Sequence, residues 1–441
     1  MSQRILVRNG RVIDPANGVD DMLDVLIDDG CVREIAQGID AGEAEVVDAT
    51  GCIVAPGFVD LHAHLREPGF EHKGTILTET TAALRGGFTT VCAMPNTNPP
   101  PDSASVVQSL WERIERDARV NVYPIGCVTL GRSGKQLAEI SELAEMGCVA
   151  LSDDGDPVAD SQLMRHALEL AGAAGLPLSE HSDDPVLNGG GSMNEGRVSE
   201  RLGLRGQPAA AEVAAVARNI ALAELTGAHL HIAHVSTARA AALIADAKAR
   251  GVPVTCEVTP SHLFLTEDQV FGEGPEPSFD TFARINPPLR TEADRRALLA
   301  ALEEGIIDAV ATDHAPHAIE DKLCEFELAA PGISCFETAL PSMVQLVRRG
   351  ELSMPRMIEA MTIGPARCFG LGARRAGTGE LKPGVSADLV VFAPEQAVTI
   401  DTDRFASKGK NTPLQGKTLH GAMVAAVLGG KIEEKVVAAG D

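Results

Sequence analysis

Residues 59–64 read Val-Asp-Leu-His-Ala-His and follow the apolar run Ile53-Val54-Ala55. That context is typical of a buried β-strand, in which side chains two positions apart point to the same face. His62 and His64 are therefore expected to share one face at a strand end. Two imidazoles placed in this way form half of a metal site. A single His-x-His pair is as often an ordinary polar strand end, so the rest of the chain has to decide.

The sequence from residue 56 to residue 365 alternates short apolar runs with Ala- and Leu-rich helical stretches. The predicted strands in this part of the chain are 89–94, 120–123, 177–181, 230–234 and 308–312, and helices are predicted at 210–225 and 238–250. Repeated strand–helix units over such a length predict a (β/α)8 TIM barrel or a doubly wound sheet.

Both ends of the chain have a different, strand-rich pattern. Residues 1–55 read as short strands and turns, with a hairpin turn predicted at Asn9-Gly10. Residues 366–441 return to apolar strands after the helical region. We therefore expect both termini to build one small β-sandwich domain, beside a catalytic barrel at 56–365.

The composition excludes several classes of partner. The 441 residues include 38 basic and 62 acidic side chains, for a net charge of −24, which argues against nucleic acid or an anionic membrane as partner. No apolar run reaches the ~20 residues of a membrane-spanning helix. The nine cysteines lack paired spacing, which favours reduced thiols in a cytoplasmic protein. The acidic balance otherwise indicates solubility and little else.

Polar side chains recur where predicted strands end, which is where barrel enzymes place their chemistry. His181, His234 and Asp313 each close a predicted strand, and the pair Asp153-Asp154 follows another apolar run. Each residue alone has an ordinary explanation, and the aspartate pair alone is more often a turn. Together they bring four histidines and one or two aspartates to one end of a barrel. That set suits Zn²⁺, and its size suits two metals that share a bridging ligand.

Four longer strings carry a resemblance to a known family. They are PGFVDLHAHLREPG at 56–69, AMPNT at 93–97, INPPLR at 285–290 and TDHAPH at 312–317. The chain resembles the dihydroorotases of the longer, bacterial type, within the amidohydrolase superfamily, over nearly its whole length. The resemblance implies a metal-dependent (β/α)8 barrel with a β-sandwich built from both termini. It also implies interconversion of N-carbamoyl-L-aspartate and (S)-dihydroorotate in de novo pyrimidine (UMP) biosynthesis.

The resemblance further implies two Zn²⁺ ions per chain. The metal ligands that it assigns are His62, His64, Asp154, His181, His234 and Asp313. Asp154 would bridge the two ions, although the neighbouring Asp153 remains an alternative. The hydantoinase and allantoinase relatives use a carboxylated lysine as the bridge. No lysine lies between Lys135 and Lys248 in this chain, so a lysine bridge is not available in this stretch.

The substrate contacts and the proton transfer follow from the same resemblance. The residues that it assigns to substrate binding are His64, Arg66, Asn96, Asn286, His317, Pro331 and Gly332. Arg66 offers a fork that can bind the substrate carboxylate with two parallel hydrogen bonds. Asp313 is expected to take a proton from the attacking water and return it to the leaving nitrogen. The segment 313–332 is expected to form a mobile lid.

Two alternatives remain open at the level of sequence. The chain could be a hydantoinase- or allantoinase-type amidohydrolase. The missing lysine and the pair Arg66-Asn96 both argue against that alternative. It could also be a catalytically inactive structural partner of aspartate transcarbamoylase, but all the expected ligands are present. The resemblance also implies a homo-oligomer. It further suggests that an active enzyme could associate with aspartate transcarbamoylase.

Overall fold

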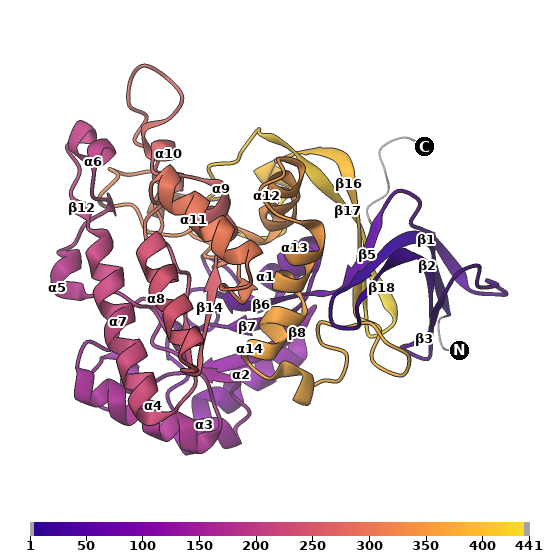
Figure 1. The fold of residues 1–441 in the computed structure, drawn as a ribbon, viewed down its shortest axis with the longest axis horizontal. Helices are drawn as coiled ribbons and strands as arrows, with labels where there is room; N and C mark the ends of the chain where they lie inside the picture. Colours follow the sequence, from indigo (N-terminus) through magenta and orange to yellow (C-terminus); the bar gives the residue numbers. More distant parts are fainter. Residues whose placement is uncertain (1–3, 436–441) are drawn as a thin grey trace.

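Eight parallel strands form one sheet whose order follows the chain (Figure 1). The computed structural model describes residues 4–435. The strands of this sheet are β6 (Phe58–Ala63), β7 (Phe88–Ala93), β8 (Asn121–Gly126), β9 (Ala150–Leu151), β10 (Leu178–Glu180), β13 (Leu230–Ile232), β14 (Val254–Val258) and β15 (Ala309–Val310). A parallel bridge between Ala63 and His314 joins the first strand to the segment after the last. The sheet therefore closes as the predicted (β/α)8 barrel, and the doubly wound alternative is wrong.

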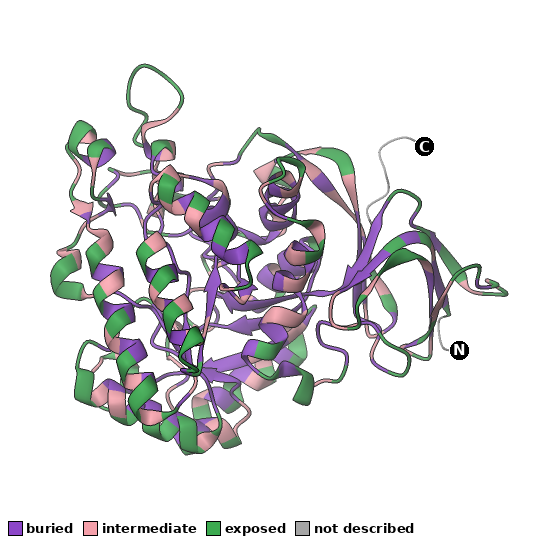
Figure 2. Ribbon diagram, viewed as in Figure 1, coloured by how far each residue is buried: buried purple, intermediate pink, exposed green. Residues whose placement is uncertain are grey.

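A helix follows each barrel strand and covers the outside of the barrel. These helices are α1 (Ile76–Arg85), α2 (Ala104–Asp117), α3 (Ile140–Glu145), α4 (Ser161–Ala174), α7 (Ala209–Thr226), α8 (Ala238–Ala249), α11 (Glu292–Glu303) and α12 (Phe336–Arg348). Their boundaries follow local chemistry. In α4 the Asp160 side chain accepts the free N–H groups of Gln162 and Leu163, and Gly175 ends the helix in a left-handed conformation. The strands are coloured as buried along most of their length, while exposed residues gather on the outer sides of the helices (Figure 2).

Short elements lie in the loops that connect the strands to the helices. They are η1 (Leu130–Arg132), α5 (Pro185–Asn188), β11 (Met193–Asn194), α6 (Arg197–Leu202), β12 (Gly206–Gln207), α9 (Pro260–Phe264), α10 (Asp268–Phe271), η2 (Thr281–Ala283) and η3 (Ile319–Asp321). After α12 the chain continues through α13 (Met354–Met361), α14 (Ile363–Cys368) and η4 (Leu371–Ala373). None of the helices between residues 4 and 435 combines the length and the apolar content that a bilayer crossing requires.

The two ends of the chain build a second sheet beside the barrel (Figure 1). Its strands are β1 (Ile5–Asp14), β2 (Val19–Asp28), β3 (Cys31–Ala36), β4 (Glu45–Asp48), β5 (Ile53–Pro56), β16 (Leu389–Thr399), β17 (Thr418–Leu428) and β18 (Lys431–Lys435), and η5 (Thr402–Arg404) lies between β16 and β17. Antiparallel pairing of β5 with β16 joins the two ends, as the sequence predicted. The boundaries at residues 55 and 365 stay a prediction, and residues 1–3 and 436–441 lie outside the described part.

The predicted hairpin turn at Asn9-Gly10 is wrong. Both residues lie inside β1, where the pairing with β2 shifts register between Val7 and Gly10. Asn9 has a φ of 62°, and its N–H donates to the Asp24 carboxylate at 2.9 Å. The dipeptide therefore forms a bulge in the strand instead of reversing the chain, since Asn and Gly favour a positive φ in both settings.

Candidate active site and metal centre

The predicted metal ligands all lie at the carboxyl-terminal mouth of the barrel. They are His62, His64, Asp154, His181, His234 and Asp313. In β6 the pairing with β7 shifts register between Asp60 and Ala63, a bulge of the kind that re-aims side chains beside active sites. The Asp60 carboxylate braces this bulge, because it accepts the N–H of His62 at 3.1 Å and the hydroxyl of Thr312 at 2.5 Å. Burial raises the pKa of Asp60 to about 7.

Asp154 lies between two pairs of histidines. Its Oδ1 is 3.4 Å from Nε2 of His62 and 3.4 Å from Nε2 of His234. The same oxygen is 3.6 Å from Nδ1 of His181, and Oδ2 is 3.6 Å from Nε2 of His64. Two groups of atoms able to hold a metal ion therefore share this one carboxylate. Burial would raise the pKa of Asp154, but His62, His181 and His234 hold it well below its usual range.

Asp153, the alternative bridge, points elsewhere. Its carboxylate accepts the N–H groups of Val128 at 2.9 Å and Thr129 at 3.2 Å, and it also accepts the Thr129 hydroxyl. These bonds hold the loop after β8, so Asp153 braces the fold while Asp154 faces the histidines. The geometry favours Asp154 over Asp153 as the shared ligand.

The donor atoms fit a metal ion. His62 is fully buried, and among the described residues its Nε2 has no hydrogen-bond partner. Its Nδ1 lies 2.7 Å from the Glu257 carboxylate, which can only accept, so Nδ1 carries a proton and Nε2 is the nitrogen left to face a metal ion. Leaving a buried polar atom without a partner costs about 1–3 kcal/mol, which a bound metal would offset.

Glu257 is a site residue that the sequence did not reveal. It lies in β14, accepts from His62, and is also 3.1 Å from Nε2 of His231. Burial alone would raise the pKa of Glu257, but the two histidines hold it well below its usual range. The sequence signal that could have found Glu257 is its place inside the apolar stretch 254–258, because a buried carboxylate has to have a partner.

We expect Glu257→Gln to weaken metal binding by about 10–100-fold, as loss of an outer hydrogen-bond partner of a ligating histidine does. The amide keeps the shape of the side chain but removes the charge that orients His62. The measurement is metal retained after dialysis against a graded chelator. Glu337→Gln is the matched control, since Glu337 accepts from the Ala406 backbone instead of a histidine. Equal retention in both variants would contradict this role.

Asp313 lies beside the histidines but outside both metal-capable groups. Its Oδ1 is 3.0 Å from Nε2 of His64 and 3.6 Å from Nε2 of His62. Burial would raise the pKa of Asp313, but His62 and His64 outweigh it and lower that pKa. The carboxylate is therefore ionised at neutral pH and able to accept a proton.

The predicted substrate residues contact the histidines or one another. Asn96 accepts from Nδ1 of His64 at 2.8 Å, and Nδ2 of Asn286 lies 3.2 Å from Nε2 of His181. Nη2 of Arg66 lies 3.2 Å from Nε2 of His317. These side chains therefore surround the same mouth.

Pro331 and Gly332 use their backbone groups within the protein. The Gly332 N–H donates to the Arg284 carbonyl at 2.9 Å, and the Pro331 carbonyl lies 3.0 Å from Nε2 of His317. The expected contact of this backbone with a substrate ring stays a prediction. The segment 313–332 contains the short η3, and its mobility as a lid also stays a prediction.

The fold is shared with solved structures along almost the whole chain. An L-hydantoinase (dihydropyrimidinase) from Arthrobacter aurescens aligns with a TM-score of 0.86 and 26% identity, covering 99% of this chain and 98% of that one. A dihydropyrimidinase from Brevibacillus agri aligns with a TM-score of 0.84 and 25% identity, covering 98% and 95%. Fold and site together define the class as cyclic amidohydrolases.

Closer relatives narrow that class. The family model described as Dihydro-orotase-like matches residues 51–240. A dihydroorotase of Anaeromyxobacter dehalogenans is 50% identical over 433 residues, which cover 98% of each chain. A dihydroorotase of Geobacter metallireducens is 47% identical over 432 residues, which cover 98% of this chain and 99% of that one. The chain belongs to the dihydroorotase family and is an enzyme, a cyclic amide hydrolase, which confirms the resemblance.

Proposed function

We propose that this enzyme interconverts N-carbamoyl-L-aspartate and (S)-dihydroorotate in de novo pyrimidine biosynthesis, with two Zn²⁺ ions as cofactors. The proposed ligands are His62, His64, Asp154, His181, His234 and Asp313. The single observation that carries the proposal is the placement of Asp154 between two histidine pairs. Imidazole nitrogens and carboxylate oxygens form a donor set that zinc prefers. Bound zinc supplies an activated water and polarises the amide carbonyl.

The chain's own residues then have to move a proton. The Asp313 carboxylate, ionised and 3.0 Å from His64, is placed to accept the proton of the attacking water. It returns that proton to the ring nitrogen as the amide bond breaks. In the cyclisation direction the same carboxylate takes the proton from the nitrogen, because the two directions share one path.

Arg66 supports a substrate that carries a carboxylate. Its Nε donates to the Pro316 carbonyl at 3.0 Å and its Nη2 faces His317. Burial lowers the pKa of Arg66 to about 10, so the guanidinium is charged at neutral pH. Among the described residues no carboxylate forms an ion pair with it. A partly buried cation without an anionic partner favours a ligand that brings one.

We expect Arg66→Met to lower kcat/KM for dihydroorotate by ~10²-fold. Losing one partner of a buried charge pair costs about 3–5 kcal/mol, and the partial exposure of Arg66 places it at the low end. Dihydrouracil and hydantoin contain the cyclic amide without the carboxylate, so their kcat/KM should change much less. The measurement is kcat/KM for all three substrates on the unmodified chain, on Arg66→Met and on Arg116→Met. Arg116 is the control, because it pairs with Asp117 at the surface.

The same measurement decides between the enzyme classes. If the unmodified chain preferred hydantoin or dihydrouracil to dihydroorotate, the hydantoinase alternative would replace the proposal. If it hydrolysed none of the three with metal bound, the inactive structural partner of aspartate transcarbamoylase would replace it. A homo-oligomer, association with aspartate transcarbamoylase and a cytoplasmic location stay predictions.

A further inference from the structure

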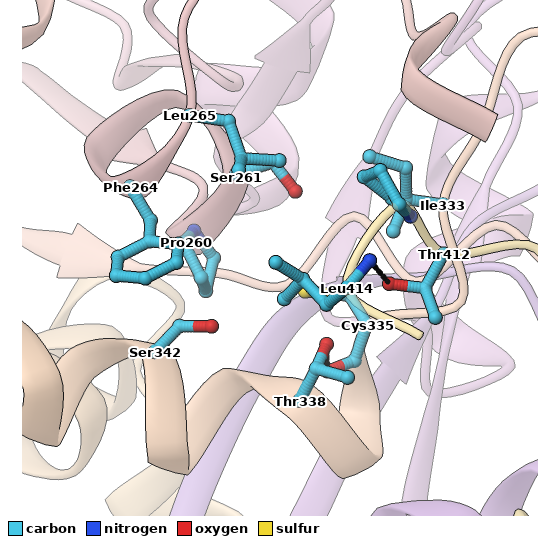
Figure 3. A pocket seen from close by; sticks show the side chains of 11 residues that line it. Pro260, Ser261, Phe264, Leu265, Ile333, Cys335, Thr338, Ser342, Thr412 and Leu414 are labelled. Carbon is cyan, nitrogen blue, oxygen red and sulfur yellow. Dashed lines mark hydrogen bonds between the residues drawn. The ribbon is translucent and has the colours of Figure 1, made fainter. Parts of the chain in front are cut away.

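The segment 405–414, between β16 and β17, leaves the terminal sheet and lies against the mouth of the barrel. The N–H of Ala406 donates to Glu337 at 3.0 Å, and the N–H of Lys408 donates to Glu79 at 3.2 Å. Further along, Thr412 and Leu414 line a small pocket together with α9 and α12 (Figure 3). The segment is therefore fixed to the barrel on both sides of Asn411.

Asn411 uses all of its side-chain hydrogen-bonding groups to join two parts of the substrate site. Its Nδ2 donates to the carbonyls of Ala315 at 3.0 Å and Gly332 at 2.9 Å. Its Oδ1 accepts the N–H of His317 at 2.9 Å and the hydroxyl of Ser334 at 2.8 Å. The residue is only 1% exposed. A fully satisfied buried amide of this kind fixes the positions of the groups that it contacts.

Lys322 also donates to the Gly332 carbonyl. Its Nζ donates to the carbonyls of Ala330 at 2.7 Å, Gly332 at 3.1 Å and Arg284 at 3.3 Å. The side chain is fully buried, and none of the described carboxylates forms an ion pair with it. Burial lowers the pKa of Lys322 to about 7. Burying a lysine among carbonyls has a desolvation cost that an apolar side chain of similar length would not have, so a positional role accounts for Lys322 better than stability.

We propose that Asn411 and Lys322 are positioning residues that hold Gly332 and His317 in the arrangement that receives the substrate. This inference rests on the proposed function. Both side chains donate to the Gly332 carbonyl, and Gly332 has a φ of 148° with no room for a Cβ, which would lie 2.7 Å from that of Ala315. The held loop presents the Pro331 carbonyl to Nε2 of His317 at 3.0 Å. The same ring nitrogen lies 3.2 Å from Nη2 of Arg66, so the position of the loop also sets the position of His317 beside the guanidinium.

The sharpest test is Asn411→Asp, which keeps an acceptor for His317 and Ser334. It replaces the donor with a carboxylate oxygen that faces the carbonyls of Ala315 and Gly332. We expect KM for dihydroorotate to rise about tenfold or more, with kcat changed by less than about threefold and metal content unchanged. Gln415→Glu is the matched control, since it makes the same change four residues later on an exposed side chain.

Lys322→Met provides a second variant that removes the other donor. We expect it also to raise KM, and the double variant with Asn411→Asp to raise KM by less than the product of the two effects, because both act on Gly332. A fall in turnover at unchanged KM would mean fewer folded molecules and would overturn the proposal. Full additivity, or a KM equal to that of the control, would overturn it as well. If either single variant fails to fold, the other decides.

Hydrogen exchange separates this inference from the proposed function. Backbone amides of residues 328–335 should exchange faster in Asn411→Asp than in Gln415→Glu, while those of β6 stay equally protected. Equal exchange in both variants would overturn the positioning role of Asn411 even if dihydroorotate were the substrate. If the unmodified chain failed to hydrolyse dihydroorotate but exchange rose as expected in Asn411→Asp, the proposed function would fail and the positioning role of Asn411 would stand.

Discussion

Asp154→Ala is expected to lose bound metal and, with it, nearly all turnover. The carboxylate belongs to both groups of atoms that can hold a metal ion, so its removal weakens both at once. The loss of metal affinity should exceed the ~10–100-fold loss that follows from removing an outer hydrogen-bond partner of a ligating histidine. The measurements are metal per chain after gel filtration and kcat for dihydroorotate hydrolysis.

Asp153→Ala is the matched control for that experiment. Asp153 accepts from Val128 and Thr129 and does not face the histidines, so this variant should retain metal. The variant should lose about 1–3 kcal/mol of stability, because the N–H groups of Val128 and Thr129 are left without an acceptor. The reverse ranking of the two aspartates would show that the wrong one was assigned as the bridge. Activity should also be insensitive to removal of bicarbonate, which a carboxylated lysine would require.

Asp313→Asn is expected to lower kcat by ~10²–10⁴-fold, the usual contribution of general acid–base catalysis. The amide has the size of the carboxylate but cannot accept the proton of the attacking water. The other five proposed ligands, which make up both metal-capable groups, stay in place, so most of the bound metal should remain. Asp308→Asn is the control, since Asp308 precedes the same strand at its other end and pairs with Lys248. Near-normal turnover in Asp313→Asn would exclude the proposed proton transfer.

The position of the site could be predicted from the sequence because a parallel barrel has only one catalytic end. His62, His181 and His234 each follow an apolar run that becomes a strand, and the carboxyl ends of parallel strands meet at one mouth. The predictions at 177–181, 230–234 and 308–312 ran too long. At 230–234, for example, β13 ends at Ile232 and the chain turns His234 toward Asp154. Burial alone does not distinguish a strand residue from a buried residue of the site.

Contacts between distant segments could not be predicted from the same pattern. The choice between Asp153 and Asp154 depends on how one turn is oriented, which composition and spacing do not specify. Asn411 contacts Gly332 and His317 across 79 and 94 residues of sequence, respectively. Asn411 lies in the segment 405–414, which leaves the terminal sheet between β16 and β17. The strand pattern on either side of this segment predicts only another hairpin. Lys322 gave no signal either, because a lysine in a polar loop is ordinarily exposed.

The most direct test of the account is dihydroorotate hydrolysis measured while zinc is removed from the purified chain and then added back. The account predicts that activity disappears with the metal and returns in proportion to zinc bound, up to two ions per chain, with kcat/KM for dihydroorotate above that for hydantoin. Undiminished hydrolysis by the metal-free chain, or no hydrolysis with both ions bound, would contradict it.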